Sequence, residues 1–354
     1  MSKVTRKTII LLLAALALSA CGKHSHTPDD SEQPALIGFA PLSQDEMTKG
    51  EAEEFPHSNF GIWGIARKTG STRNLWENAF TEVRRQGDSY VPVADEYWEA
   101  GYSYDFIALA PYDAVPINAE TEKPDVTITP ALNKMEFDFD MADRYEDADY
   151  AFDLMTAVAH TPEVEIASLQ EPVDLTFWHL LAGVRINITF SGMENASVTG
   201  LRLRNVATER SYTITDVNDV LKATYATDTA GQTLQTITLD NTDDITANDL
   251  VTGKDSQNRD CQYKILHIIP QSIENLEMDM DFTIGSVATN NFKLNLEAAK
   301  YTTTDGVKEP VVYLHNHWYN WNISITPKGI TFDVTVTPWA EATGDDSDFE
   351  FDFE

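Results

Sequence analysis

Cysteine is scarce in this chain of 354 residues and occurs only at Cys21 and Cys261. If Cys21 is modified, as the N-terminal segment predicts below, only Cys261 remains, so no disulfide can form within the chain and its stability has to come from packing. Hydrophobic residues make up 42% of the sequence, which is ample for real cores in a chain long enough for two domains of about 150 residues each. Disorder throughout the chain is not expected.

Positive charge is also scarce, since 25 Lys and Arg face 57 Asp and Glu and the formal net charge is −32. A surface this acidic repels nucleic acid and anionic membranes. We therefore expect no nucleic-acid partner and no attachment to a membrane through charge.

Motifs of common enzyme classes are absent. The sequence has no Gly-rich phosphate loop, no G-x-S-x-G elbow and no H-E-x-x-H. Cys261 follows Asp260 with no evident activating histidine, which predicts a buried or inert thiol. Paired carboxylates for glycoside hydrolysis stay open in so acidic a chain, but abundance of acids alone does not indicate such a pair. We expect no enzyme activity and no cofactor.

Clusters of residue types that can bind metals also have explanations that involve no metal. His315 and His317 would share one strand face, but a pair without a third ligand is usually incidental. His179 lies in an apolar run, where a hydrogen-bonded core or interface histidine is commoner than a ligand. Two acidic clusters lack the glycine turn of a calcium loop, and solvated carboxylates explain them equally well. These clusters are Asp138, Asp140, Asp143, Glu146, Asp147 and Asp149, and Asp240, Asp243, Asp244 and Asp249. No metal site is expected.

No apolar run in the N-terminal segment reaches the about 20 residues that span a bilayer. The run Ile9–Leu18 follows three basic residues, an order typical of a secretion signal. The segment ends in Leu18-Ser19-Ala20-Cys21, which resembles the lipobox of bacterial lipoproteins, in which the cysteine thiol takes a diacylglycerol. We predict a lipoprotein signal peptide at residues 1–20 and lipidation of Cys21. The alternative is an ordinary secretory signal with a chance cysteine.

The predicted mature chain would be more acidic still. Removal of residues 1–20 leaves 22 basic against 57 acidic residues, a net charge of about −35. Its membrane attachment would therefore depend on the lipid, and the two or three acyl chains of a lipoprotein cysteine anchor stably where one chain binds only marginally. Residues 21–35 are polar and without apolar periodicity, which predicts a flexible tether.

Short alternating runs separated by turn residues dominate the rest of the sequence. Alternation with one polar face is typical of antiparallel sheets packed as a sandwich. The clearest case is Trp321–Thr326, a turn at Pro327–Gly329, and Ile330–Val336, which predicts a hairpin. Further predicted strands cover residues 36–40, 60–66, 104–110, 184–190, 264–269 and 276–284.

Helical spacing is best between Asn74 and Arg85, where apolar residues recur at about every fourth position. This pattern favours a helix, although two short strands explain it equally. No repeat of 20 to 50 residues is visible, which argues against a solenoid or propeller. A change of texture between His160 and Val173 predicts two all-β domains, at 36–168 and 169–340, followed by an acidic tail at 341–354.

A series of sequence blocks is informative through its order and spacing. The blocks are residues 60–64, 96–98, 104–108 with Pro111, 153–157, 175–182, 269–271, 318–323 with Ile330, and 336–339. In this arrangement the chain resembles the fimbrillin-like proteins of Bacteroidales, the subunits and anchors of type V pili. The resemblance implies two transthyretin-like, Greek-key β-sandwich domains in tandem, no catalysis, and a place at the surface of the cell outer membrane.

The resemblance also implies a mode of assembly. In such families a protease removes the first strand after export, and the groove left behind accepts a C-terminal strand of the next subunit. The first-strand candidate here is Leu36–Leu42. Cleavage between Lys49 and Gly50 would release lipid and strand, whereas arginine-directed cleavage has no site there. Alternatively, Lys49 is a solvated loop lysine and the chain stays whole.

The C-terminal tail offers a candidate donor strand. Phe349, Phe351 and Phe353 alternate with acids, so an extended backbone would place three rings on one face. A frayed acidic tail is equally consistent with this composition.

The sequence therefore predicts a fimbrillin-like lipoprotein, a structural component of a cell-surface pilus assembled by strand exchange and mediating adhesion as anchor, shaft or tip subunit. Its partners would be other pilus subunits, the outer membrane through the lipid on Cys21, and a ligand on a host or bacterial surface. The alternative is a surface glycan-binding lipoprotein of a nutrient-uptake system, whose signature would be exposed Trp and Tyr platforms.

Overall fold

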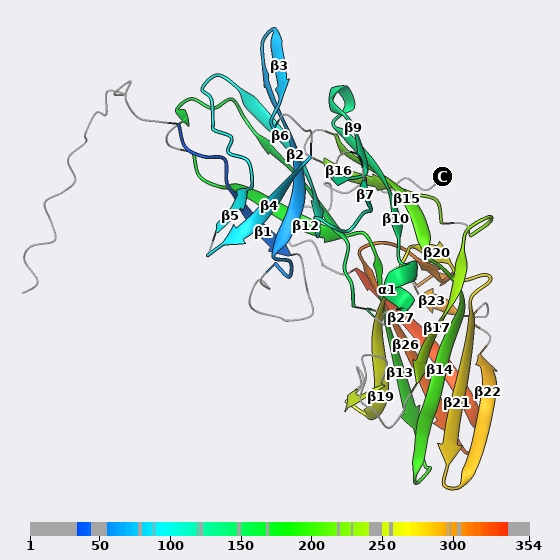
Figure 1. Cartoon of the computed structure of the whole chain (residues 1–354). Helices are drawn as coiled ribbons and strands as arrows, with labels where there is room; N and C mark the ends of the chain where they lie inside the picture. The colour runs from blue at the N-terminus through cyan, green and yellow to red at the C-terminus, as the bar shows by residue number, and fades with distance from the viewer. Residues whose placement is uncertain are drawn as a thin grey trace, which may run out of the picture.

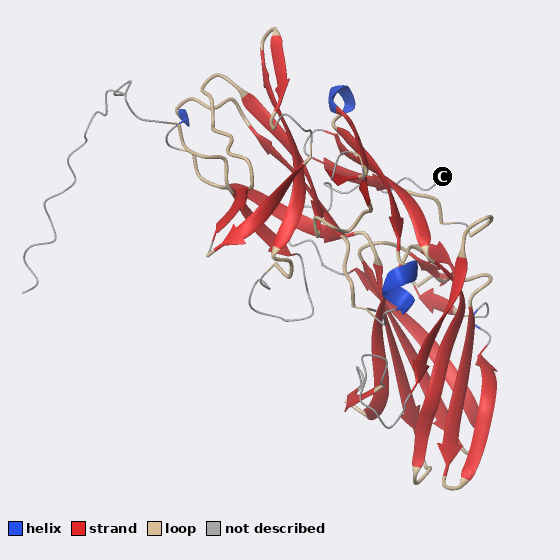
Figure 2. Ribbon diagram, viewed as in Figure 1, coloured by secondary structure: helices blue, strands red, loops and turns tan. Residues whose placement is uncertain are grey.

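The computed structural model describes residues 34–338, apart from 44–54, 77–79, 88, 119, 121–122, 147–148, 150, 168–169, 218–219, 228, 241–249, 255–257, 295, 297–298 and 303–305. Among these residues strands are the predominant element, joined by loops, with a short helix, α1 (Ala142–Glu146), and a 3-10 turn at Pro130–Leu132 (Figure 2). The all-β prediction is confirmed.

The first sheet closes into a barrel, because β6 pairs back with β2 (Figure 1). In ring order its strands are β2 (Asn59–Lys68), β4 (Thr81–Gln86), β5 (Ser89–Pro92), β1 (Phe39–Ser43), β12 (Val173–His179), β11 (Met155–Thr161) and β6 (Ser103–Ala110), and β3 (Ser71–Asn74) pairs with β2 outside the ring. Successive side chains of a strand point to opposite faces. Phe60 and Ile62 therefore join one core cluster, while Trp63 and Ile65 join another on the outer side.

A second, four-stranded sheet covers that outer side. Its order is β16 (Val220–Thr224), β15 (Glu209–Val217), β10 (Lys134–Asp140) and β9 (Val126–Thr129). Phe137, Phe139 and Tyr212 from this sheet share a core with Trp63 and Ile107 of the barrel. This sheet is called the cover sheet below.

The C-terminal part is a sandwich of two sheets, at the lower right of Figure 1. The five-stranded sheet is ordered β18 (Val251–Lys254), β19 (Asp260–Ile268), β13 (Ala182–Phe190), β26 (His317–Thr326) and β27 (Gly329–Pro338). The four-stranded sheet is ordered β17 (Leu234–Asp240), β14 (Ala196–Ala207), β21 (Glu277–Ile284) and β22 (Val287–Leu294). Ile186, Trp321 and Met280 are buried between them, in the core that also reaches the cover sheet.

Small two-stranded sheets complete the fold. They are β7 (Ile117–Asn118) with β8 (Lys123–Pro124), β20 (Gln271–Ser272) with β25 (Val312–Tyr313), and β23 (Lys300–Thr302) with β24 (Lys308–Pro310).

The predicted C-terminal hairpin is confirmed, since β26 and β27 pair from His317 opposite Pro338 to Thr326 opposite Gly329. The helix favoured for Asn74–Arg85 is wrong, and of the alternative of two short strands the structure shows one strand in this range, β4, after the end of β3. β3 ends at Asn74 and β4 begins at Thr81. Trp76 has a left-handed backbone (φ 53°), which a helix excludes, and its indole N–H donates to Ala94 O at 2.9 Å. The spaced apolar residues are thus core anchors at a chain reversal.

Strand pairing crosses the boundary predicted near residue 168. β12 follows that position but pairs with β1 and β11 of the barrel. β15 pairs with β10 of the cover sheet, from Lys134 opposite Thr215 to Asp140 opposite Glu209. A cut of the sequence at residue 168 therefore does not separate the sheets, and the domain limits stay a prediction.

Candidate assembly site around the first strand

The first strand is attached to the barrel mainly along one side. β1 runs parallel to β12, from Phe39 opposite Val173 to Ser43 opposite Phe177. Within the part of the chain that the structure describes, its pairing with β5 on the other side is limited to Phe39 opposite Tyr90. Pro41 has no N–H and so cannot donate to either ladder. Loss of β1 would therefore open the barrel between β5 and β12 while leaving most other pairings intact.

Two side chains at the start of this segment, Ile37 just before β1 and Phe39 within it, nevertheless lie in the interior of the barrel. Ile37 and Phe39 are fully buried. The Phe39 ring meets those of Phe60 and Phe106 edge-on, at centroid distances of 5.9 and 5.5 Å, a favourable geometry for aromatic pairs. Upstream, Ile37 N donates to Glu96 O at 2.9 Å. Removing this segment would expose aromatic surface inside the barrel.

Phe55 is a second anchor, on the other side of residues 44–54. It is buried, and its ring lies 4.6 Å from that of Phe177 and 5.8 Å from that of Tyr90. The Tyr90 hydroxyl donates to His57 O at 2.9 Å. The barrel thus holds the chain independently at β1 and at Phe55, on either side of the stretch that contains Lys49 and Gly50.

A buried carboxylate fixes the cover sheet to the outer end of the barrel. Asp105 on β6 accepts from Arg67 Nε at 2.7 Å and lies 2.7 Å from His160 Nδ1. The same guanidinium donates to Pro130 O at 3.1 Å and to the side chain of Asn133. Asn133 adopts a left-handed conformation (φ 45°) at the turn between β9 and β10. One arginine therefore joins β2, β6 and this turn.

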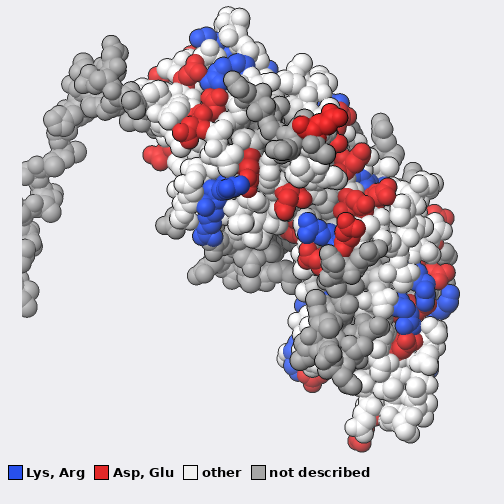
Figure 3. All heavy atoms as spheres, in the orientation of Figure 1, with Lys and Arg blue, Asp and Glu red and all other residues white. Residues whose placement is uncertain are grey.

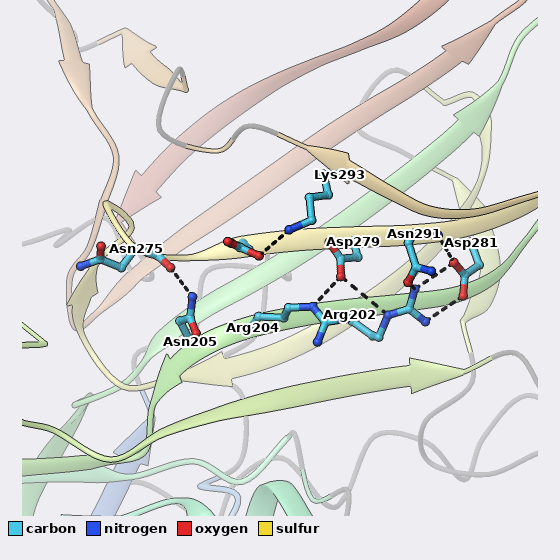
Figure 4. Close-up of polar contacts among 9 residues, drawn as sticks. Arg202, Arg204, Asn205, Asn275, Asp279, Asp281, Asn291 and Lys293 are labelled. Carbon is cyan, nitrogen blue, oxygen red and sulfur yellow. Dashed lines mark hydrogen bonds and ion pairs between the residues drawn. The ribbon is translucent and has the colours of Figure 1, made fainter.

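Charge is distributed unevenly over the surface. Figure 3 shows acidic side chains gathered over the cover sheet, whereas acidic and basic side chains alternate on the sandwich. There, Glu277, Asp279 and Asp281 follow one another at every second position of β21. Three cations on the neighbouring strands β14 and β22 match them, which are Arg202, Arg204 and Lys293 (Figure 4).

This charge ladder is partly buried. Arg202 binds Asp281 with two hydrogen bonds of 2.7 and 2.8 Å, a bidentate geometry, and these bonds lower the pKa of Asp281. Asp279 is only 2% exposed at its side chain and accepts from Arg204 Nε. The ladder joins β14 and β21 and leaves this face electrically balanced in a strongly acidic chain.

The candidate metal ligands are not brought together. His315 Nδ1 lies 2.5 Å from the Tyr225 hydroxyl, and His317 Nδ1 lies 2.7 Å from His315 O. Among the described residues, no group of three His, Cys, Asp or Glu is arranged to hold a metal ion. His179 is a hydrogen-bonded core histidine, as predicted, with Nδ1 2.7 Å from Asp153. Cys261 is buried, as predicted.

The acidic clusters serve local structure where they are described. Asp138 accepts from Ser211 Oγ at 2.6 Å, and Asp140 accepts from Ala142 N at 2.7 Å at the start of α1. Several predicted residues lie outside the described part of the chain. They are Cys21, Lys49, Gly50, Asp147, Asp243, Asp244, Asp249, Phe349, Phe351 and Phe353.

Sequence reasoning missed Phe55 and the single pairing of β1 with β5. Phe55 stands between an acidic run and a proline, where no periodicity marks it as core. Pro41 was the available signal for a weakly paired strand, because proline within a run indicates an edge.

The described residues contain no helix long and apolar enough to cross a membrane. A barrel whose first strand pairs mainly on one side, its cover sheet and a β-sandwich together define an all-β protein. A family model described as fimbrillin-like matches residues 52–339. The chain belongs to the fimbrillin-like family.

Solved structures agree with this fold. A fimbrial protein from Bacteroides vulgatus ATCC 8482 matches with a TM-score of 0.52 and 15% identity, over 86% of this chain and 99% of its own. A protein ascribed to cell adhesion, from Bacteroides ovatus ATCC 8483, matches with a TM-score of 0.52 and 12% identity, over 87% of this chain and 99% of its own. Among curated proteins no relative matches.

Proposed function

We propose that this chain is a lipoprotein subunit of a cell-surface pilus, attached to the outer membrane through Cys21 or released from it by trimming, that joins its neighbours by strand exchange and serves adhesion. Family membership supports the pilus role. The observation that carries strand exchange is the pairing of β1. It pairs with β12 along its length, while on its other side the described residues show Phe39 opposite Tyr90 and, just upstream of β1, a bridge of Leu36 with Tyr97.

An extended segment with apolar residues at every second position would fit the place of β1. Ile37 and Phe39 fill the barrel interior at that spacing, because alternate residues of a strand share one face. Phe349, Phe351 and Phe353 have the same spacing in the tail. An incoming strand without a proline at the position of Pro41 would also restore a ladder donor, so main-chain bonds would favour the exchange.

Trimming between Lys49 and Gly50 would decide the role of the subunit. Phe55 is held by Phe177 and Tyr90 rather than by β1, so the new N-terminus would stay fixed to the barrel after the first strand leaves. An untrimmed chain would keep its lipid and act as an anchor. We also propose that barrel and sandwich correspond to the two tandem transthyretin-like domains of the family.

Two measurements on protein from cells test this proposal. Intact mass and N-terminal sequencing give lipidated Cys21 for an anchor, or Gly50 for a trimmed subunit. Deletion of residues 345–354 is expected to abolish polymers that contain this chain and resist detergent. The matched control replaces Asp348, Glu350 and Asp352 by their amides, which keeps the three rings. Intact polymers after the deletion would exclude the tail as donor strand, and cells that form the same filaments without the gene would exclude the pilus role.

Glycan binding through aromatic platforms is not favoured by the described residues. Trp63, Trp98 and Trp321 are core residues, and among the large hydrophobic side chains that are exposed Tyr97 is the aromatic one.

A further inference from the structure

The place that β1 takes between β5 and β12, called the first-strand slot below, holds an uncharged segment (Figure 1). Residues 34–43 contain no Asp, Glu, Lys or Arg. Ile37 and Phe39 lie in the barrel interior, whereas Leu36 and Leu42 are exposed. The slot is therefore occupied by a strand that brings no charge on either face.

Asp174 borders the outer face of this slot. β1 runs parallel to β12 with Ala40 opposite Asp174, and neighbouring strands lie about 5 Å apart. Phe39 and Val173, one position earlier in each strand, are buried, whereas the Asp174 side chain is exposed. The residue of an incoming strand that takes the place of Ala40 therefore lies beside this carboxylate.

Other acids lie close to the upstream end of the slot. Ile37 N donates to Glu96 O at 2.9 Å, so the stretch around Glu96 flanks the start of the first strand. Asp95, the residue before Glu96, is exposed, and so is Glu171, two residues before β12. These carboxylates add to the negative potential at the slot.

The cations of β4 are bound within the barrel. Arg84 lies 2.7 Å from Glu82, and Arg85 Nε donates to Gly87 O at 3.1 Å. β5 also separates β4 from the slot. Among the residues that pair with β1 in the described part of the chain, Asp174 is the charged one.

The tail of this chain carries the wrong charge for this slot. Residues 345–354 contain six acids and no basic residue. A ring that takes the place of Phe39 brings an acid into the place of Ala40, because the tail alternates Phe and acid from Asp348 to Glu354. The acid is Glu350, Asp352 or Glu354 in a strand parallel to β12, and Asp348, Glu350 or Asp352 in the reverse direction. Like charges directly opposite each other destabilise a sheet, and two copies with a net charge of −32 each also repel.

We propose that the first-strand slot rejects the tail of a second copy and takes the donor strand of a different subunit. That strand has apolar residues at the inward positions and uncharged or basic residues between them. The inference rests on the strand exchange proposed above. Specificity of this kind comes from an unfavourable contact with the wrong partner, and it makes the chain a member of a mixed polymer rather than of a homopolymer.

Peptide binding to a cut chain tests this selectivity. The full chain, purified from cells in detergent, carries a recognition site for a sequence-specific protease between Lys49 and Gly50 and is cut before use. Three labelled peptides are titrated against it and followed by fluorescence anisotropy. They are residues 34–43 as the positive control, residues 345–354 as the tail peptide, and an amide peptide, which is the tail peptide with Asp348, Glu350, Asp352 and Glu354 replaced by Asn or Gln.

The amide peptide should bind at least about threefold more tightly than the tail peptide at low ionic strength. Added salt should narrow this gap, because it screens the charges. D174K should raise the affinity for the tail peptide by about threefold or more and change that for the amide peptide by less than about twofold. The control E274K makes the same change of charge at an exposed residue between β20 and β21 and should leave the gap as it is.

Three results would overturn the proposal. Equal binding of the tail and amide peptides would show that charge does not select the donor strand, although strand exchange itself would stand. The same gap in D174K and E274K would show that Asp174 is not the selecting residue. If even the 34–43 peptide does not bind, the slot does not exchange its strand, and both the strand exchange and the selectivity that rests on it are wrong.

Discussion

The hydroxyl of Tyr225 and the ring of His315 form a buried pair across 90 positions of sequence, with 2.5 Å between the oxygen and Nδ1. The same hydroxyl accepts from the main-chain N–H of His315 at 3.1 Å. Donating to the ring and accepting from the backbone, Tyr225 fixes the turn that leads into β26. Because neutral imidazole is needed as the acceptor, this pair makes folding sensitive to pH.

Acid is expected to destabilise the protein through His315. Burial lowers the pKa of His315 from 6.5 to about 3. The unfolded chain therefore binds this proton first, so the stability contributed by neutral His315 is complete above about pH 6.5 and is lost toward pH 3. Between these two pH values, this group should lower the free energy of unfolding by about 1.4 kcal/mol for each pH unit of acidification. Urea midpoints at several pH values measure it.

The matched variant for this prediction is H315Q. It should be less stable near neutral pH, because the Tyr225 pair is altered, but its stability should fall less steeply between about pH 6 and 4. Equal slopes for parent and variant would contradict the prediction. Y225F is expected to lower stability by about 1–3 kcal/mol at neutral pH, the usual cost of an unmet buried group.

The inward ring of the first strand is expected to matter only while that strand is in place. F39A removes a buried ring that contacts Phe60 and Phe106, and such truncations cost about 3–5 kcal/mol. Unfolding in urea of the untrimmed chain measures this loss. The control L42S changes a side chain that is 47% exposed and should leave the midpoint unchanged. A similar midpoint for F39A and L42S would show that Phe39 does not support the barrel.

Local features of the fold were predictable from sequence, whereas long-range pairing was not. The β26–β27 hairpin follows from alternation on both sides of Pro327–Gly329, all within one short window. The parallel pairing of β1 with β12 places Phe39 opposite Val173. The local sequence of neither strand identifies the strand with which it pairs. The same reason hid the return of β15 to the cover sheet.

The candidate site could be predicted only in part, because its pairing and anchoring depend on residues that are far apart in the sequence. A short apolar run predicted a strand at Leu36–Ala40, within the first-strand candidate Leu36–Leu42, but the one-sided pairing of β1 depends on where β5 lies in space. The anchoring of Phe55 depends on Phe177, more than a hundred positions away. Periodicity indicates which face of a strand or helix is buried, but it does not identify the element that packs against that face.

Loss of Arg202 is expected to weaken the sandwich more than loss of Lys293. Arg202 holds Asp281 by two hydrogen bonds and lies 4.0 Å from the nearly buried Asp279. R202A therefore removes the bidentate partner of Asp281 and leaves Asp279 with Arg204 alone, at a cost of about 1–3 kcal/mol. Lys293 and Glu277 are 67% and 47% exposed, so K293A should be nearly neutral because solvent screens such pairs. Thermal unfolding of R202A and K293A measures the two losses of stability. Equal losses in the two variants would contradict the prediction.

A close approach between Gly183 and Trp318 should make Gly183 intolerant of any side chain. A Cβ at Gly183 would lie 2.6 Å from the Trp318 ring, which also packs beside His267. G183A must therefore displace the indole or bend β13, and overpacking of this kind costs about 1–3 kcal/mol. The matched control is G38A on the barrel, where the nearest atom to the added Cβ would be 3.7 Å away, an ordinary contact. Urea unfolding should show a lower midpoint for G183A alone. If G183A kept the parent midpoint, the indole would have room to move, and the packing of β13 against β26 would be looser than the structure shows.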